Sequence, residues 1–296
     1  MRSLYLIDSS IYVFNAWFGL PDSLTHVSGQ PNNAFVGFTD FAYRFLQQER
    51  PLRAVFAFDE SLAQSARNDI YPDYKANRAP APEELKRQFG WCREFVQALG
   101  FSQVASNRHE ADDLIGSLAL LHRGADQRIV ILTGDKDLAQ LIGEFDEWWS
   151  FAAGHRLGYR ALQKKFGVRP EQIADQLALA GDKVDNIPGI PGIGMTIAGR
   201  LLVKFGSLAN LRQNLERVGD MKFRGARRVM DLLREHEAIL DISSRLTRVD
   251  CDVVEMREVV IERQAPDIDR LTGMFNEHRL GASRMARWDA LLEALA

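Results

Sequence analysis

The chain has 296 residues, of which 46% are hydrophobic and 26% charged, enough to build one large domain with an insertion or two domains. No run approaches the roughly 18 to 20 apolar residues of a membrane helix, and the segment after Met1 lacks the layout of a signal peptide. Cys92 and Cys251 are the only cysteines and lack metal-ligand spacing. We therefore expect two reduced thiols and a cytoplasmic protein.

Acidic and basic residues are unevenly distributed along the chain. A formal net charge of −3 argues against a nucleic-acid partner, but the total can mislead when acids and bases are segregated. Residues 156–169 contain five bases and no acid, and residues 195–234 contain nine bases and three acids. Such runs are typical both of phosphate-binding surfaces and of solvated helix faces, so they leave the question open.

Three short apolar runs in the first half of the chain predict a parallel sheet. Leu4–Ile7, Ala54–Phe58 and Ile129–Thr133 show little alternation, and a helical pattern follows each. An aspartate stands directly after each run or within two residues of it. Because ligands of such sheets bind beyond the carboxyl ends of the strands, we expect the functional site at that edge.

Prolines divide the segment between the second and third runs. Those at residues 72–82 interrupt regular structure and predict a loop or arch before a helix over Glu83–Leu99. Another helix is expected to begin near Glu110, because Leu114 and Leu118 have the spacing of a buried helix face.

From Pro170 onward the pattern is mostly helical. Residues 170–180 predict a helix with proline in its first turn, and the glycines and prolines of residues 188–194 predict a tight hairpin before a helix that ends near Phe205. A basic helix is expected within residues 222–248, and strands near residues 249–254 and 259–261. A last amphipathic helix is expected to include Trp288, Leu291 and Leu292.

Nine carboxylates lie at the predicted strand ends, helix starts and a glycine-rich loop. Like charges a few ångström apart raise each other's pKa, whereas Mg²⁺ takes several oxygen ligands and also binds phosphate. Two such ions about 4 Å apart can activate a water molecule and stabilise the leaving oxygen in phosphodiester hydrolysis. Without the nine acids the formal net charge of −3 becomes +6. They are Asp8, Asp59, Glu110, Asp112, Asp113, Asp135, Asp137, Asp182 and Asp185.

Each of these acids has a simpler explanation when taken alone. Asp8 and Asp59 are also typical of loops or helix caps, and residues 110–113 of acids that complement a helix dipole. Asp182 and Asp185 are also typical of solvent-exposed or capping residues. Only the joint placement of the acids favours a metal site.

Six segments resemble, in order and spacing, the 5′→3′ exonuclease and flap endonuclease family, especially the 5′ nuclease domain at the start of bacterial DNA polymerase I. The resemblance covers about residues 4 to 250. It implies an α/β fold, a PIN-like mostly parallel sheet flanked by helices, with an α-helical helix-three-turn-helix (helix-hairpin-helix) subdomain that binds DNA. The segments are Leu6–Ser10, Phe58–Asp59, Tyr71–Arg78, Glu110–Asp113, Thr133–Asp137 and Gly181–Gly189.

The same resemblance implies a division of the chain and its cofactors. We expect a nuclease domain over residues 1–168 with an arch at about 65–95, a helix-hairpin-helix region over 169–250, and a segment over 251–296 that packs back on the nuclease domain. Two Mg²⁺ ions are implied, with Mn²⁺ able to replace them. Asp8, Asp59, Glu110, Asp112 and Asp113 resemble ligands around one ion and its bridging positions. Asp135, Asp137, Asp182 and Asp185 resemble ligands or close neighbours of the second.

Basic residues of the arch match the part of the family that contacts the substrate. Lys75 and Arg78 match a pair on the scissile phosphate, and with Asp112 and Asp135 they are the residues expected to carry catalysis. Tyr74 resembles an aromatic residue that stacks on a terminal base, although a packed arch residue is equally typical. Arg67 matches a further basic position, whereas Ala66 replaces the usual aromatic before it.

The hairpin and the helices after it are expected to hold the DNA duplex. Glycines at the hairpin let backbone N–H groups approach a phosphate at the next helix N-terminus, and the resemblance implies K⁺ on the backbone carbonyls. Thr196-Ile197 departs from the Lys-Thr of relatives, and Arg200 one turn later is the candidate substitute. The expected DNA-binding residues of this region are Gly189, Gly192, Gly194, Arg200, Arg227 and Arg228.

The expected partner is DNA with a 5′ flap, a nick, a branch or a single-stranded 5′ end, in replication or repair. The chain ends soon after the DNA-binding region, so we expect a monomer that works alone or is recruited to a DNA polymerase or ligase. The alternatives are a PIN-like ribonuclease, usually shorter, and a non-catalytic protein that binds branched DNA. A haloacid-dehalogenase-type phosphatase is disfavoured, because it needs an aspartate where Ser10 stands.

Overall fold

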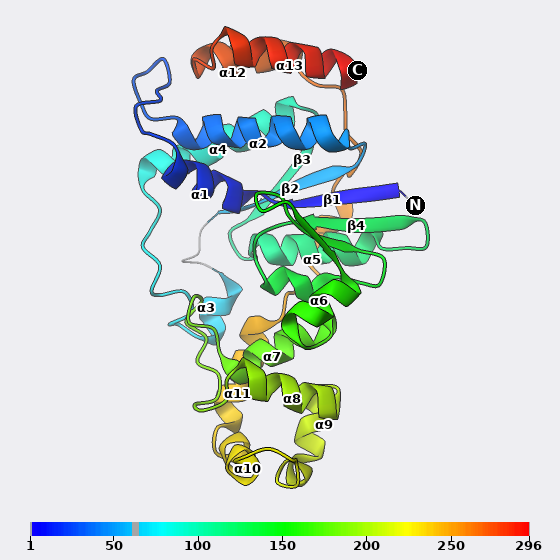
Figure 1. The fold of residues 1–296 in the computed structure, drawn as a ribbon. Coiled ribbons are helices and arrows are strands. Elements are labelled where there is room, and N and C mark those ends of the chain that lie inside the picture. Colours follow the sequence, from blue (N-terminus) through cyan, green and yellow to red (C-terminus); the bar gives the residue numbers. More distant parts are fainter. Residues whose placement is uncertain (1, 61–64, 296) are drawn as a thin grey trace. The chain divides into compact units, whose positions relative to one another are not determined.

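The computed structural model describes residues 2–60 and 65–295, and the chain divides into two compact units. The sheet unit comprises Met1–Glu60, Pro80–Gly134 and Cys251–Ala296, and the helical unit comprises Ser61–Ala79 and Asp135–Asp250. Figure 1 shows the elements of both units along the chain. In the part of the chain that is described, no helix has the length and apolar character needed to cross a membrane.

The sheet unit is built on four parallel strands in the order β3-β2-β1-β4. They are β1 (Arg2–Asp8), β2 (Ala54–Asp59), β3 (Ser102–Ser106) and β4 (Gln127–Leu132). The central strands are buried on both faces, as their unalternated apolar sequences require. Their register pairs Tyr5 of β1 with Ala54 of β2 and with Val130 of β4.

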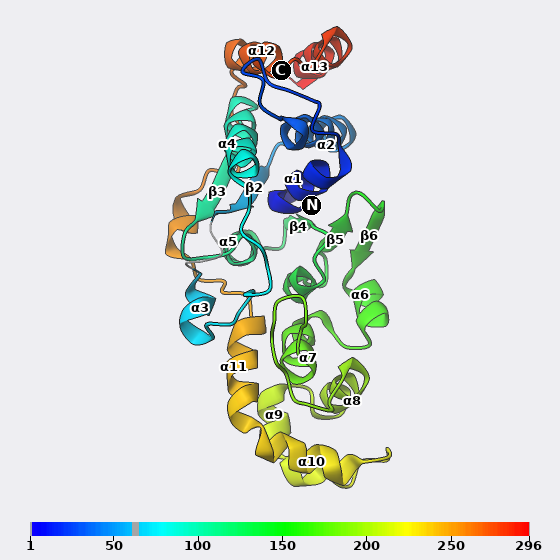
Figure 2. The ribbon, with the colours of Figure 1, turned by 90° about the vertical axis from the view of Figure 1, so that its left-hand side faces the viewer.

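Helices cover both faces of this sheet. One face carries α5, and the other carries α1, α2 and α4, with α12 and α13 packed outside α4 and α2 (Figure 1, Figure 2). The helices of the unit are α1 (Ser9–Gly19), α2 (Asn33–Glu49), α4 (Glu83–Ala98), α5 (Ala111–His122), α12 (Ile268–Glu277) and α13 (Ala282–Leu295), with a 3-10 turn η5 (Val254–Glu258).

The helical unit is organised around α7, which packs against α8 and α11, while α3 packs against α11. Thr247 fixes one of these contacts, because its hydroxyl donates to the carbonyl of Ala174 at 2.9 Å. Its α-helices are α3 (Ala66–Ile70), α6 (Tyr159–Phe166), α7 (Ile173–Ala180), α8 (Met195–Phe205), α9 (Leu208–Gln213), α10 (Ala226–Glu235) and α11 (Glu237–Thr247). A hairpin β5 (Glu147–Ser150) and β6 (His155–Gly158) and the 3-10 turns η2 (Asp137–Leu141), η3 (Pro170–Gln172) and η4 (Leu215–Val218) complete it.

Most predicted elements are confirmed. The three apolar runs form β1, β2 and β4, and the expected helices are α4, α5, α8 and α13. Trp288, Leu291 and Leu292 are buried on α13, as their spacing indicates. The helix expected over residues 170–180 is divided into η3 and α7, and the long basic helix is divided into α10 and α11 at His236.

The strands expected near residues 249–254 and 259–261 are wrong. Residues 254–258 form the 3-10 turn η5 instead. Residues 259–263 make only a short contact with the segment before β2, where Ala54 N–H donates to the carbonyl of Ile261 and Arg263 N–H to that of Leu52. The apolar side chains Val253, Met256 and Ile261 are buried without a strand, so hydrophobicity alone misled the prediction.

Two glycines let the loop between α7 and α8 close on itself. Gly189 has a φ of 59°, and a Cβ added there would lie 2.2 Å from the backbone nitrogen of Gly181. Gly181 has a φ of 77°, and a Cβ added there would lie 2.7 Å from the carbonyl oxygen of Pro188. Both positions therefore require glycine, for conformation and for space.

We expect Gly189→Ala to lower the free energy of unfolding by about 2 kcal/mol or more, because left-handed strain alone costs roughly 1–2 kcal/mol and the clash is with backbone. Gly194→Ala is the matched control, since a Cβ there meets no described atom within 4 Å and φ is −96°. Urea denaturation of both variants measures the difference. Equal stability would contradict this account of the loop.

Candidate functional site

Five of the nine acids belong to the sheet unit, and we call them the strand-end acids. Asp8 is the last residue of β1 and Asp59 the last of β2. Register places Asp8 opposite Ala57, so the two strands end at the same edge. Helix α5, which packs on β1 and β2, contributes the others at its first turn. The strand-end acids are Asp8, Asp59, Glu110, Asp112 and Asp113.

Hydrogen bonds orient the two aspartates at the strand ends. Thr133 donates its hydroxyl to Oδ2 of Asp8 at 2.8 Å, and Ala111 N–H donates to Oδ1 of Asp59 at 3.0 Å. Asp8 precedes α1 but makes no side-chain capping bond to it. Helix capping therefore does not account for Asp8, whereas Asp59 also helps to fix the start of α5.

The acids at the start of α5 differ in their local roles. Asp113 accepts a hydrogen bond from Glu110 N–H at 3.1 Å and so forms part of a capping box at the start of α5. Glu110 and Asp113 are nevertheless buried, with 5% and 2% of their surfaces exposed. Burial of carboxylates is costly unless they are paired or bind a metal ion, and the helix N-terminus offsets only part of that cost.

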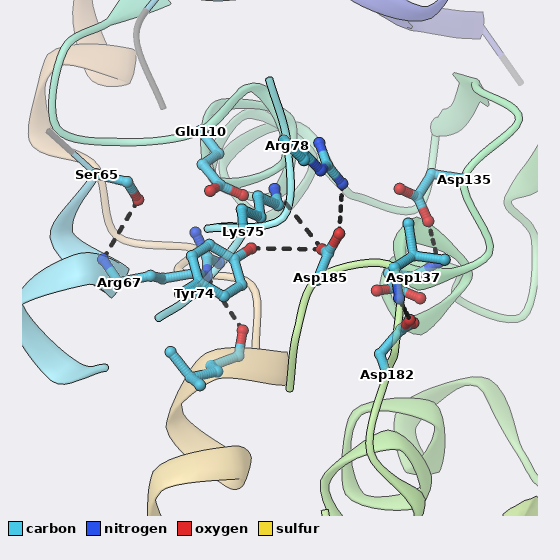
Figure 3. A network of polar contacts seen from close by, with 12 residues as sticks. Ser65, Arg67, Tyr74, Lys75, Arg78, Glu110, Asp135, Asp137, Asp182 and Asp185 are labelled. Atoms are coloured by element: carbon cyan, nitrogen blue, oxygen red, sulfur yellow. Dashed lines mark hydrogen bonds and ion pairs between the residues drawn. The ribbon is translucent and has the colours of Figure 1, made fainter. Parts of the chain in front are cut away.

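The other four acids belong to the helical unit, and we call them the loop acids: Asp135, Asp137, Asp182 and Asp185. Asp137 N–H donates to Oδ1 of Asp135 at 2.8 Å, and Lys136 Nζ donates to Oδ2 of Asp182 at 2.6 Å. Val184 N–H donates to the second oxygen of Asp182 at 2.8 Å. Lys136 thereby joins the two loops that carry these acids. Figure 3 labels the four loop acids.

Asp185 holds the basic residues of the predicted arch. Lys75 Nζ lies 3.7 Å from Oδ2 of Asp185, and the guanidinium of Arg78 pairs with Oδ1 (Figure 3). Lys75 N–H also donates to the backbone carbonyl of Asp185 at 3.0 Å. Lys75 adopts a φ of 54°, which is uncommon for a residue other than glycine. The contacts with Asp185 thus hold Lys75 in an unusual backbone conformation.

Burial and mutual repulsion shift the pKa values of the loop acids. Burial, together with the charge of Asp135, raises the pKa of Asp137 to about 7. Burial and the charge of Asp185 also raise the pKa of Asp135, while the pKa of Asp182 is lowered by Lys136 against the effect of burial. Oδ1 of Asp137 is buried with no hydrogen-bond partner among the described residues. This oxygen and its neighbours fit the ligand preference of a hard divalent cation.

Arg67 and Tyr74 lie in the interior of the helical unit. Arg67 is 8% exposed and donates to the carbonyls of Leu246 and Arg248, both at 3.1 Å. Tyr74 is 4% exposed and packs against Ile187 and Leu246. These contacts connect the arch segment to α11, and the expected contacts of Arg67 and Tyr74 with DNA stay predictions.

The expected phosphate-binding residues lie on α8, α10 and the loop before α8. Arg200 on α8 and Arg227 and Arg228 on α10 are exposed. Gly192 has a φ of 87°, and Gly194 stands immediately before α8 with open space around its Cα. Exposed positive charge and an unobstructed helix start are what binding of a phosphate backbone requires.

Sequence reasoning assigned no role to Lys136 or Thr133, which orient Asp182 and Asp8. Both lie inside the segment Thr133–Asp137, which carries the family resemblance. Their membership of this segment was the only feature of the sequence that pointed to a role. Periodicity could not have found them, because each acts through a side-chain contact with a residue far away in sequence.

The parallel sheet with acids at its carboxyl edge defines a PIN-like nuclease fold, and comparison with known proteins gives the family. A model for the 5′-3′ exonuclease N-terminal resolvase-like domain matches residues 3–167, and one for the 5′-3′ exonuclease C-terminal SAM fold matches residues 168–269. The 5′-3′ exonuclease of Aquifex aeolicus is 34% identical over 278 residues, covering 94% of this chain and 92% of that protein. The chain belongs to the 5′-3′ exonuclease family and is a nuclease.

Other relatives are longer or more distant. DNA polymerase I of Pseudomonas aeruginosa is 37% identical over 253 residues, but the match covers 84% of this chain and only 27% of that polymerase. T5 5′-exonuclease, solved with bound zinc, has a TM-score of 0.65 at 18% identity and covers 94% of this chain and 98% of its own. The catalytic core of Rad2 with a DNA substrate has a TM-score of 0.64 at 17% identity, covering 100% and 92%. These likenesses confirm the fold.

We expect the stability of the metal-free protein to depend on Asp137. Because its pKa in the folded protein, about 7, lies above the ordinary 3.8, the stability that it contributes in acid is lost as pH rises from about 4 to 7. In EDTA, Asp137→Asn should therefore raise the melting temperature by an amount that grows from pH 5 to pH 7 and then levels off.

The exposed Asp220 provides the control, since Asp220→Asn should show no such trend. Melting curves at four pH values, with and without Mg²⁺, measure the effect. A gain from Asp137→Asn that is constant or falls with pH would contradict the raised pKa.

Proposed function

We propose that this chain is a structure-specific 5′ nuclease that hydrolyses DNA phosphodiester bonds, as a 5′→3′ exonuclease and a 5′ flap endonuclease, by a two-metal-ion mechanism. The observation that carries the proposal is the contact of Asp185 with both Lys75 and Arg78. An acid suited to a metal ion and two cations suited to a phosphate are held in one cluster, which is what phosphoryl chemistry needs.

Two Mg²⁺ ions are the proposed cofactors, with Mn²⁺ able to replace them. We assign the strand-end acids to one ion and the loop acids to the other, with Asp112 and Asp135 among the catalytic ligands. When bound, such ions supply an activated water and charge stabilisation for the leaving oxygen. Thr133 and Lys136 would keep Asp8 and Asp182 oriented towards their ions through the hydrogen bonds described above.

Lys75 and Arg78 would change partners when substrate binds. In the structure both pair with Asp185. If Asp185 held a cation, Lys75 and Arg78 would instead donate hydrogen bonds to the scissile phosphate. Lys75 is the better placed of the two for catalysis, because its side chain is only 10% exposed and charges act more strongly where water is excluded.

The remaining contacts would position the duplex. We assign phosphate contacts to the hairpin glycines Gly189, Gly192 and Gly194 and to the exposed arginines of α8 and α10, with K⁺ bound by the hairpin carbonyls. Arg67 would fix the arch to α11, and Tyr74 would stack on a terminal base only if it leaves its present packing. We infer a cytoplasmic monomer that serves replication or repair, alone or with a DNA polymerase or ligase.

A gel assay with a 5′-labelled DNA flap, a nicked duplex, single-stranded DNA and an RNA flap tests this function. With Mg²⁺ the wild type should cut the DNA flap and the nicked duplex, and EDTA should stop it. Asp135→Asn should abolish most cleavage, since it removes an anionic ligand. Preference for the RNA flap would point to a ribonuclease, and binding without cleavage by clean protein would overturn the proposal.

Lys75→Ala should reduce kcat by roughly 10²-fold or more and change DNA affinity little, since the contact matters mainly in the transition state. The backbone bond from Lys75 to Asp185 survives this substitution. Lys183→Ala is the matched control, because Lys183 is an exposed lysine two residues before Asp185. Single-turnover kinetics with binding titrations separate the effects, and a loss confined to affinity would reassign Lys75 to phosphate steering.

Changing both Arg227 and Arg228 to Ala should weaken DNA binding and spare kcat. Each phosphate contact that is lost should make the slope of log K against log salt shallower by about 0.9. A double variant of Arg44 and Arg257, two exposed arginines of the sheet unit, removes the same charge and should change the slope little. Identical slopes for the two double variants would exclude α10 from the DNA interface.

A further inference from the structure

A second cluster of potential metal ligands lies in the sheet unit on elements that carry none of the nine acids. His26 stands in the tight loop between α1 and α2, where Thr25 and Pro31 form a bridge. Glu277 is the last residue of α12, and His278 follows it. One ligand atom from each of these three residues lies within 4.8 Å of the other two.

The backbone brings these residues together independently of any ligand. Val27 N–H donates to the carbonyl of Glu277 at 2.8 Å, and the side-chain amide of Asn32 donates to the carbonyl of His278 at 2.9 Å. The loop of residues 25–31 is thus fastened at two points to the end of α12, and the three side chains cannot separate far without breaking these bonds.

His278 has a ring nitrogen that needs a partner. Its side chain is 2% exposed, and its Nδ1 is buried without a hydrogen-bond partner among the residues that the structure describes. An unsatisfied buried polar atom is costly, and native proteins contain few of them. This atom is the observation that points to a ligand rather than to chance proximity.

The two ring nitrogens of His26 differ in their surroundings. Its Nδ1 lies 2.8 Å from the hydroxyl oxygen of Ser28 and accepts the backbone N–H of Ser28 at 3.1 Å. Binding of a metal ion through Nε2 requires the tautomer with the proton on Nδ1, in which Nδ1–H donates to the Ser28 hydroxyl instead of accepting from Ser28 N–H. His26 and Glu277 are both partly exposed, so an ion can reach them from solvent.

Two features of the cluster oppose metal binding. Arg270 Nη1 lies 3.2 and 3.3 Å from the two oxygens of Glu277, and its charge disfavours a nearby cation. The rings also pack as an aromatic group, with His26 stacked on Trp91 and His278 against Phe35. Arg270 has a shorter bond to Glu94, at 2.7 Å, so it keeps a partner if Glu277 turns away. Ring packing provides no hydrogen bond for Nδ1 of His278.

We propose that His26, Glu277 and His278 bind one divalent transition-metal ion, with Zn²⁺ as the best match, and that the ion fastens the loop of residues 25–31 to the end of α12. Two imidazoles and one carboxylate are a ligand set that suits zinc and not magnesium. Bonds of about 2.0–2.1 Å place tetrahedral ligands roughly 3.4 Å apart, so the three ligand atoms, now within 4.8 Å of one another, must move slightly closer together. Water would take the fourth position.

Zinc titration against a competing chelator, starting from EDTA-treated protein, tests the proposal. Because zinc also binds carboxylates, the measured quantity is the difference between variants. The wild type should bind one more zinc ion per chain than His26→Gln or Glu277→Gln, or bind that ion at least tenfold more tightly. Glu94→Gln is the matched control, since it removes the same charge from the other partner of Arg270 and should keep the ion.

Two further readouts make the test decisive. Co²⁺ bound at this cluster should give visible absorption typical of tetrahedral coordination, absent in His26→Gln. Cleavage in Mg²⁺ should be the same for wild type and His26→Gln, so the result does not depend on the nuclease proposal. Equal zinc stoichiometry and affinity in the wild type and both variants would overturn the site and leave a packed aromatic cluster. Loss of the ion in Glu94→Gln as well would also overturn it, by showing an effect of charge alone.

Discussion

Repulsion among fixed carboxylates is the constraint on which the rest of the structure depends. The buried Asp113 and the half-buried Asp137 lie where solvent screens charge poorly. The protein tolerates this by two means, bonds from neighbouring N–H groups and pairing with Lys136, Lys75 and Arg78. A bound divalent cation is the third means that we propose.

The same acids also hold the local structure around them. Asp59 accepts a hydrogen bond from the first N–H of α5, and Asp182 accepts one from the N–H of Val184. One oxygen of each aspartate therefore stabilises the local backbone. The other oxygen of Asp182 accepts a hydrogen bond from Lys136, which orients the carboxylate. An asparagine at these positions would keep the fold-related bond and lose the charge. Asp→Asn substitutions therefore test chemistry with little disturbance of the loops.

Much of this organisation follows from the sequence because it depends on local pattern. The runs that form β1, β2 and β4 are apolar and short, and the parallel register of β1 and β2 places Asp8 and Asp59 at one edge. Strand β3 was not predicted, because Ser102, Gln103 and Ser106 dilute its apolar character and it lies beside a single neighbour, β2. For residues 249–261 the prediction failed in the opposite sense, because closely spaced valines suggested strands where the structure has the turn η5 and one isolated bridge between Arg53 and Glu262.

The candidate site was less accessible to sequence reasoning than the fold. The acids could be recognised because they lie at predicted strand ends, helix starts and a glycine-rich loop. The pairing of Asp185 with Lys75 and Arg78 could not, because it joins residues more than a hundred positions apart. The burial of Tyr74 depends on its contact with Ile187 and Leu246, which no local pattern encodes. The cluster of His26 with Glu277 and His278 joins the two ends of the chain and has no motif in one segment.

The most direct test of the central claim is to locate the divalent ions themselves. Crystals of the protein soaked in Mn²⁺ should show anomalous scattering at the strand-end acids and, separately, at the loop acids, with oxygen ligands at each position. Asp182→Asn with Asp185→Asn should remove the second signal and keep the first. Absence of manganese from both groups of acids, at concentrations that support cleavage, would contradict the account.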